Sequence, residues 1–255
     1  MTNTQTGGPP DDREQSILSH LLELRNRLLK AVICIGVVFV IMSPFSNDIF
    51  SYLAQPLMRH LETSSMIATG VAAPFIAPFK LTLFLALLFS VPYVFYQVWA
   101  FVAPGLYLHE RRLVYPLMVS STVLFYLGVA FAYYVVFDVI FAFFTASAPD
   151  GITVMTDMSA YLDFILTLFL AFGITFEVPI ATVLLIKTGI VELPTLVSAR
   201  PYIIVGSFVL GMLLTPPDVV SQTLLAIPIW ILFEAGLLVA RMVTPKDDAE
   251  STPAS

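Results

Sequence analysis

Long apolar segments alternate with short polar ones along most of this sequence. A helix needs about 20 predominantly apolar residues to cross the hydrocarbon core of a bilayer. Four segments have roughly this length, and two shorter ones follow near the C-terminus. The expected spans are residues 28–45, 74–102, 113–137, 161–186, 202–214 and 219–234. The pattern predicts an all-α membrane protein with six transmembrane helices.

The last two expected helices are unusually short. Residues 202–214 offer about 13 residues, or about 20 Å of helix, against a hydrocarbon core of about 30 Å. The return run from Val219 meets the charged Glu234 after about 15 residues. Either this pair is tilted deep inside the protein, or the bilayer thins around it.

The segment before the first span has its own pattern. Residues 1–15 are polar, contain Gly and Pro, and are expected to form a disordered tail. From Ser16 onward leucines recur at helical spacing with charges between them, which predicts an amphipathic helix at the interface that runs into the first span. The tail lacks the basic region of a cleavable signal peptide, so the first span is expected to be an uncleaved anchor. The membrane domain is expected to cover residues 16–242, followed by a second disordered tail at 243–255.

A longer polar interval, residues 46–73, separates the first two spans. Its YLAQPLMRHL sequence at 52–61 indicates a short surface helix. Pro56 within it is a structural candidate of this outer loop.

Composition agrees with a membrane protein. Hydrophobic residues make up 58% of the 255 residues and charged residues 12%, whereas a soluble domain carries about 25% charge. Mean hydropathy is +0.89. The net charge of −6 gives no indication of nucleic-acid binding, because the acidic residues lie mainly in the tails and outer loops. The single cysteine, Cys34, excludes an intrachain disulfide and is expected to be a small packing residue.

The distribution of basic residues predicts the orientation. With six spans, the outer segments hold only Arg59 and Lys80, and the positive-inside rule therefore places both termini in the cytoplasm. The inner segments hold Arg13, Arg25, Arg27, Lys30, Arg111, Arg112, Lys187, Arg200, Arg241 and Lys246.

The common catalytic motifs are absent from the sequence. It has no HExxH zinc helix, no GxSxG elbow and no P-loop lysine motif, so no catalytic residue, metal or cofactor is expected. Its three histidines lie at membrane flanks. No internal repeat is visible at half-chain spacing, which weakens a secondary-transporter architecture.

The densest polar patch between two apolar runs is FVAPGLYLHERRLV at residues 101–114. Arg111 and Arg112 are expected to hold this loop on the cytoplasmic side. Glu110 either offsets part of their positive charge or accepts a cation from a partner. Glu23 has the same ambiguity, because it can pair with Arg27 at i,i+4. Two such carboxylates could each accept one guanidinium by paired hydrogen bonds, which lysine cannot reproduce.

Glu177, in FGITFEVP, is expected inside the fourth span. A carboxylate there is functional by default, unless it only makes a structural hydrogen bond beside the kink at Pro179. Thr215, Asp218 and Gln222 form a second polar group, in which Asp218 either contributes to function or caps the last helix. We expect Glu234 at the inner interface near Arg241.

Four segments in this order closely resemble the TatC family, the signal-recognising core of twin-arginine protein translocases. They are SHLLELRNRLL at 19–29, YQVWAFVAPGLYLHERRLV at 96–114, FGITFEVP at 172–179 and GMLLTPPDVVSQTLLAIP at 211–228. The resemblance covers roughly residues 16 to 242. It implies six helices in a concave, glove-like bundle with both termini cytoplasmic.

The resemblance also implies a function without a catalytic centre. The family binds twin-arginine signal peptides at the cytoplasmic face and, with TatB and TatA, exports folded proteins using the proton-motive force. Glu23 and Glu110 would contact the two arginines, supported by Arg25, Phe101 and His109. Glu177 would be the polar residue facing the concave groove. Met212, Thr215 and Gln222, with Asp218 in the same polar cluster, would bear the contact face for TatB and TatA.

Two other classes of function remain as alternatives from the residues alone. A proton-coupled transporter of small solutes could use Glu177 as its titrating group. An intramembrane enzyme ranks third, because neither a nucleophile, nor metal ligands, nor a paired aspartate site is visible.

Overall fold

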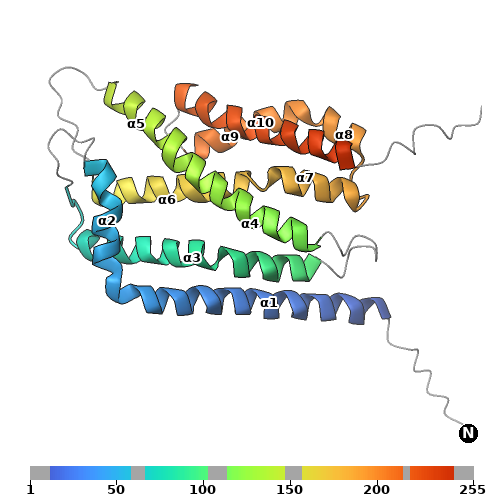
Figure 1. Ribbon diagram of the computed structural model, residues 1–255, viewed down its shortest axis with the longest axis horizontal. Coiled ribbons are helices and arrows are strands. Elements are labelled where there is room, and N and C mark those ends of the chain that lie inside the picture. Colours follow the sequence, from blue (N-terminus) through green and yellow to red (C-terminus); the bar gives the residue numbers. More distant parts are fainter. Residues whose placement is uncertain (1–11, 59–66, 103–113, 147–156, 215–218, 244–255) are drawn as a thin grey trace, which may run out of the picture.

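The computed structural model describes residues 12–58, 67–102, 114–146, 157–214 and 219–243, which are nearly all helical (Figure 1). In chain order the elements are α1 (Asp12–Met42), η1 (Ser43–Phe45), α2 (Ser46–Met58), α3 (Ala73–Val102), α4 (Val114–Phe131), η4 (Ala132–Val136), α5 (Phe137–Ala146), α6 (Met158–Thr175), α7 (Val178–Lys187), α8 (Leu193–Ser198), α9 (Arg200–Leu214) and α10 (Val219–Val243).

Helices long and apolar enough to cross a membrane confirm the prediction of a multi-pass all-α protein. Within the described ranges there are five of them: Ser19–Tyr52, Ala73–Val102, Val114–Ile140, Met158–Lys187 and Gln222–Met242. α9, with 15 residues, is the expected shorter apolar helix. The start of α1 and the end of α10 lie at the same end of the bundle (Figure 1). We call this end the inner end and the opposite one the outer end.

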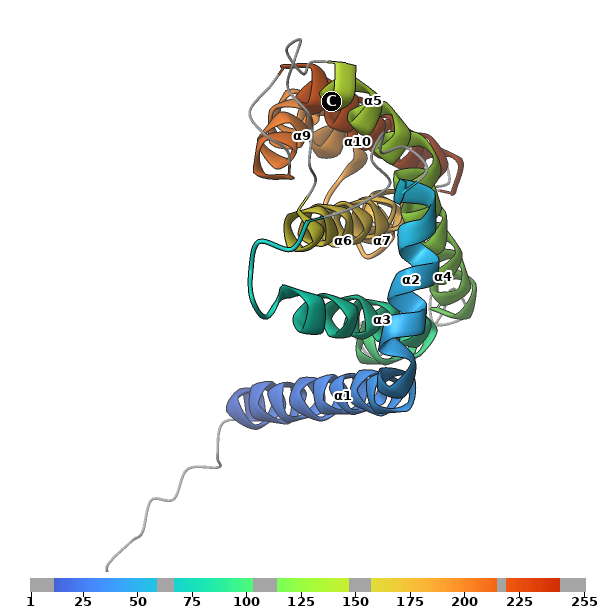
Figure 2. The ribbon, with the colours of Figure 1, turned by 90° about the vertical axis from the view of Figure 1, so that its left-hand side faces the viewer.

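Viewed along the long helices, the bundle is curved. Figure 2 shows α1, α3, α6 and α9 following one another in an arc, with α4 and α5 crossing on one side of it. α1 packs chiefly against α3. α3 in turn packs against α4 and α6, while α10 packs against α7 and α9.

The last helix is longer than the sequence predicted. α10 has 25 residues, about 37 Å of helix, and continues past Glu234. The expectation that both final helices are short is therefore wrong for α10. The reason is that Glu234 accepts a hydrogen bond of 2.7 Å from Arg200 of α9, so its charge does not end the membrane segment.

The first helix confirms that the amphipathic part runs into the first span, but it begins earlier than expected. α1 is one continuous helix of 31 residues, about 46 Å, with no break between the amphipathic part and the span. It begins at Asp12, four residues before the expected boundary of the membrane domain. The amphipathic segment thus continues along the axis of the span. The expected surface helix in the following interval is α2, which contains Pro56.

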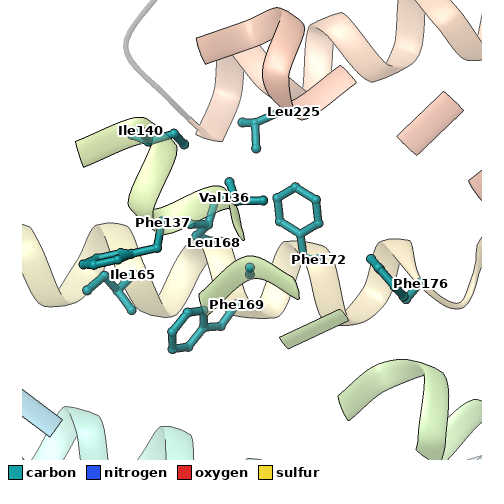
Figure 3. Packing of buried hydrophobic residues seen from close by; sticks show 10 residues of the cluster. Val136, Phe137, Ile140, Ile165, Leu168, Phe169, Phe172, Phe176 and Leu225 are labelled. Atoms are coloured by element: carbon teal, nitrogen blue, oxygen red, sulfur yellow. The ribbon is translucent and has the colours of Figure 1, made fainter. Parts of the chain in front are cut away.

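Aromatic side chains fill the centre of the bundle. Figure 3 shows Phe169 and Phe172 of α6 packed among residues of η4, α5 and α10. The crossing of α4 and α6 is very close, because a Cβ on Gly128 would lie 2.5 Å from the carbonyl oxygen of Phe172. A Cβ on Gly173 would lie 2.7 Å from the ring of Phe125. Glycine at both positions allows the two backbones this approach.

Asp157 makes hydrogen bonds to two separate segments at the outer end of the bundle. Its Oδ1 accepts hydrogen bonds from the backbone N–H groups of Ser159 and Ala160, at 3.0 and 2.9 Å, and so caps α6. Its Oδ2 accepts from the backbone N–H and the hydroxyl of Thr69, at 3.0 and 2.7 Å. The N–H of Met158 also donates to the carbonyl of Ile67 at 2.9 Å. One side chain therefore links the start of α6 to the segment before α3.

These hydrogen bonds favour the charged carboxylate. The bond from the Ala160 N–H, followed by those from Thr69, lowers the pKa of Asp157 from 3.8 to about 2. A carboxyl group with a lowered pKa in the folded state stabilises that state above its unfolded pKa, and this contribution is lost as the pH falls through about 2. The link should therefore persist unchanged from neutral pH down to about pH 4.

Replacing Asp157 by serine should separate its two tasks. Serine can still cap α6 but offers one oxygen instead of two, so the bonds to Thr69 are lost. In hydrogen exchange read by mass spectrometry, the segment around Thr69 should exchange faster while that around Ser159 stays protected. Alanine at the same position should expose both segments. Unchanged exchange at Thr69 in the serine variant would contradict the link.

Candidate functional site

The inner part of α1 carries the first predicted site residue. Glu23 is partly buried, and its Oε1 accepts hydrogen bonds from Nε and Nη2 of Arg27 at 2.9 and 2.6 Å. This confirms the i,i+4 pair that the sequence predicts. Arg25, the other predicted residue of this helix, is exposed.

An aromatic contact brings the end of α3 to this part of α1. The rings of His20 and Phe101 stack with centroids 4.3 Å apart and an interplanar angle of 23°. Glu23 follows His20 by three residues and lies on the neighbouring turn of the same helix face. Two predicted site residues that are far apart in sequence, Glu23 and Phe101, therefore lie at the same end of the α1–α3 pair.

The other predicted residues of this group fall outside the described residues. His109 and Glu110 belong to residues 103–113, which separate α3 from α4. Their proximity to Glu23 stays a prediction, as does the role of Pro56, whose helix alone is described.

Glu177 lies at a break between two helices. α6 ends at Thr175 and α7 begins at Val178, with Glu177 as the residue before α7 and Pro179 in its first turn. Proline lacks a backbone N–H, so it is tolerated in a first turn but not in a helix interior. The sequence predicted this interruption from Pro179.

The carboxyl group of Glu177 contacts polar groups of two other helices. The Ser121 side chain of α4 hydrogen-bonds it, and Trp99 Nε1 of α3 donates to the same Ser121 Oγ at 3.3 Å. Ser121 and Trp99 are buried. Oε1 of Glu177 is buried and accepts no hydrogen bond within the described part of the chain. These contacts support a structural role for Glu177. They also leave its Oε1 able to bind a proton or to accept a hydrogen bond.

The predicted partner face is described only in part. Met212 of α9 is exposed and Gln222 of α10 is partly buried, whereas Thr215 and Asp218 lie outside the described residues. α9 and α10 approach closely here, since a Cβ on Gly211 would lie 3.3 Å from the Gln222 backbone. The two helices therefore pack closely against each other at their outer ends.

At the inner end the same two helices are joined by an ion pair. Glu234 lies at this end, as the sequence predicts, and pairs with Arg200 of α9 at 2.7 Å. The pair forms because α9 packs alongside α10 and brings Arg200 to Glu234. Among the described residues no three His, Cys, Asp or Glu side chains gather where they could hold a metal ion.

The comparisons with known proteins now decide the family. The family described as Sec-independent protein translocase protein (TatC) matches residues 19–228. The chain belongs to the TatC family.

Relatives cover almost the whole chain. The Sec-independent protein translocase protein TatC of Haemophilus influenzae is 59% identical over 238 residues, 93% of this chain and 93% of that protein. The TatC protein of Escherichia coli K12 is 53% identical over 233 residues, 91% of this chain and 90% of that protein. A crystal structure described as the twin-arginine translocase receptor TatC matches with a TM-score of 0.78 and 34% identity, covering 88% of this chain and 98% of that chain. This TatC chain is accordingly a protein-transport component and a multi-pass membrane protein.

Sequence reasoning missed several residues around the site of this TatC chain. His20 makes the contact of α1 with Phe101, although the sequence shows it only as one of three histidines at membrane flanks. Ser121 gave no local signal, because its partners lie on two other helices. The cap by Asp157 could have been found, since an aspartate directly before a helix is a common N-cap.

Replacing Ser121 by alanine should destabilise the protein by about 1–3 kcal/mol, because it leaves the Trp99 N–H and the Glu177 carboxyl without this buried partner. Thermal unfolding in detergent measures the loss. Ser207→Ala is the matched control, since among the described residues the buried Ser207 hydroxyl donates to the Ile204 carbonyl of its own helix. Equal, small effects of both substitutions would contradict the polar link between α3, α4 and Glu177.

Proposed function

We propose that this chain is the receptor subunit of a twin-arginine translocase and binds twin-arginine signal peptides at its inner end. The observation that carries the proposal is the stacking of His20 on Phe101, because it joins the Glu23 turn of α1 to the end of α3. Glu110 follows Phe101 by nine residues in the sequence. The likeness to a solved twin-arginine translocase receptor supports the same reading.

The chemistry of the two carboxylates suits this ligand. Each can accept a guanidinium by two parallel hydrogen bonds, which an ammonium group cannot form. We assign one signal arginine to Glu23 and the other to Glu110. Arg25, Phe101 and His109 support the site.

The partners that we propose are TatB and TatA. Their contact face would be the outer part of α9 and α10 around Met212, Thr215, Asp218 and Gln222. α9 has 15 residues, about 22 Å, which is shorter than a hydrocarbon core of about 30 Å. A helix of this length favours a locally thinned bilayer or a covering partner. Recruited partners would supply the opening that a folded cargo requires, in a complex with several copies of the receptor.

We further propose that the protein resides in the bacterial inner membrane with both termini in the cytoplasm. The excess of basic residues in the inner segments supports this orientation. Transport would use the proton-motive force, and Glu177 is the intramembrane carboxylate available to respond to it.

Binding of a fluorescent twin-arginine signal peptide to the purified protein in nanodiscs tests the receptor function. Binding should saturate with the Arg-Arg peptide and fall strongly with a Lys-Lys peptide. Glu110→Ala should remove most of the binding and Glu23→Ala should weaken it, each by about 10-fold or more for a lost charged hydrogen bond. Glu192→Ala is the control, because Glu192 is an exposed carboxylate before α8 at the same end. Equal binding of both peptides would contradict the proposal.

Photo-cross-linking tests the partner face. A cross-linking residue at Met212 or Gln222 should capture TatB or TatA, and substitutions there should alter capture more than peptide affinity. Val123 of α4 is a suitable control position, because its side chain is also exposed on a spanning helix. The reverse pattern, with peptide affinity more affected than capture, would remove the partner assignment.

A further inference from the structure

The carboxylate of Glu23 already holds a guanidinium group that belongs to the chain itself. Nε and Nη2 of Arg27 donate to Oε1 of Glu23 at 2.9 and 2.6 Å. The side chains are 24% exposed for Arg27 and 35% for Glu23, so both are partly withdrawn from water. The group proposed to bind an arginine of the signal is thus occupied by an arginine one helical turn away.

The geometry of this pair differs from that of a forked pair. Both Arg27 donors use the same oxygen, Oε1, whereas a forked guanidinium places one donor on each carboxylate oxygen. An arginine that enters in the forked arrangement needs Oε1 as well. It must therefore displace Arg27 from that oxygen.

We propose that Arg27 is an internal competitor of the signal peptide: it occupies Glu23 when the site is empty and is displaced when an arginine of the signal binds. The inference rests on the proposed twin-arginine binding and adds a regulation of that site. In the unoccupied state Arg27 also neutralises a carboxylate close to the membrane, where an unpaired charge is unfavourable.

The strength of the pair fits a displaceable occupant. A glutamate four residues before a basic residue on a helix is the favourable order. In such a pair the ion-paired state is about twice as populated as the open state, in which the two side chains are apart. A ligand that needs the open state then binds about two- to threefold more weakly than it would without Arg27. Arg27 tunes the affinity without blocking the site.

An opposite role would be that Arg27 holds Glu23 in the orientation that receives the signal. The two roles predict opposite signs. Removal of a competitor strengthens binding, whereas removal of a positioning residue weakens it.

Fluorescence anisotropy with an Arg-Arg signal peptide and the full chain in nanodiscs distinguishes them. Arg27→Gln and Arg27→Met should each lower the Kd by about two- to threefold. Lys30→Gln is the matched control, because Lys30 is exposed on the same helix and its loss changes the net charge equally. Lys30→Gln should change the Kd by less than either Arg27 substitution does. In a Glu23→Ala background the Arg27 substitutions should have no further effect.

Three results would contradict the proposal that Arg27 competes with the signal peptide. Weaker binding by both Arg27 variants would make Arg27 a positioning residue. An equal gain for Lys30→Gln would reduce the effect to overall charge, and a gain that persists without Glu23 would remove Glu23 as its target. In each case selective binding of the Arg-Arg peptide by the wild type leaves the receptor function intact. Absence of that binding would refute the receptor function and the competitor together.

Discussion

A charge inside a membrane helix is tolerated when a partner or water compensates it, and this constraint governs how the helices of this protein meet. Glu234 in the second half of α10 pairs with Arg200 at the start of α9, and Lys80 of α3 pairs with Asp163 of α6. The first pair lies towards the inner end and the second towards the outer end. Each pair joins a stretch of one helix to a stretch of another. α10 can consequently continue as a long helix through a position that would otherwise end it.

Between these pairs, close backbone packing fixes the centre of the bundle. Gly128 and Gly173 let α4 and α6 approach until a Cβ would collide, and the aromatic cluster surrounds this crossing. α1 stands apart from this centre, since most of its large apolar side chains are exposed, whereas α3 buries residues along its whole length. The proposed signal site therefore combines a densely packed helix, α3, with one that is covered on little of its surface.

The sequence was sufficient for features that depend on neighbours along one helix. Apolar run lengths predicted the spans and the short α9, and the i,i+4 rule predicted the pair of Glu23 with Arg27. Features that depend on another helix were missed or assigned wrongly. The length of α10 depends on a partner of Glu234 that is 34 residues away, and the contact of His20 with Phe101 requires the path of α3. A one-dimensional pattern contains no information on which helices return to the same end at the same depth.

The last turns of α3 connect the two polar regions of the molecule. Phe101 contacts α1 beside the Glu23 turn, and Trp99, two residues earlier, donates to Ser121 next to Glu177. Since both side chains belong to one short stretch of helix, a displacement of this stretch changes both sets of contacts at once. A ligand that spans Glu23 and the segment after α3 would act on that stretch directly. Coupling between signal binding and the intramembrane carboxylate would then need no chain of intermediate residues, because both contacts begin on the same helix end.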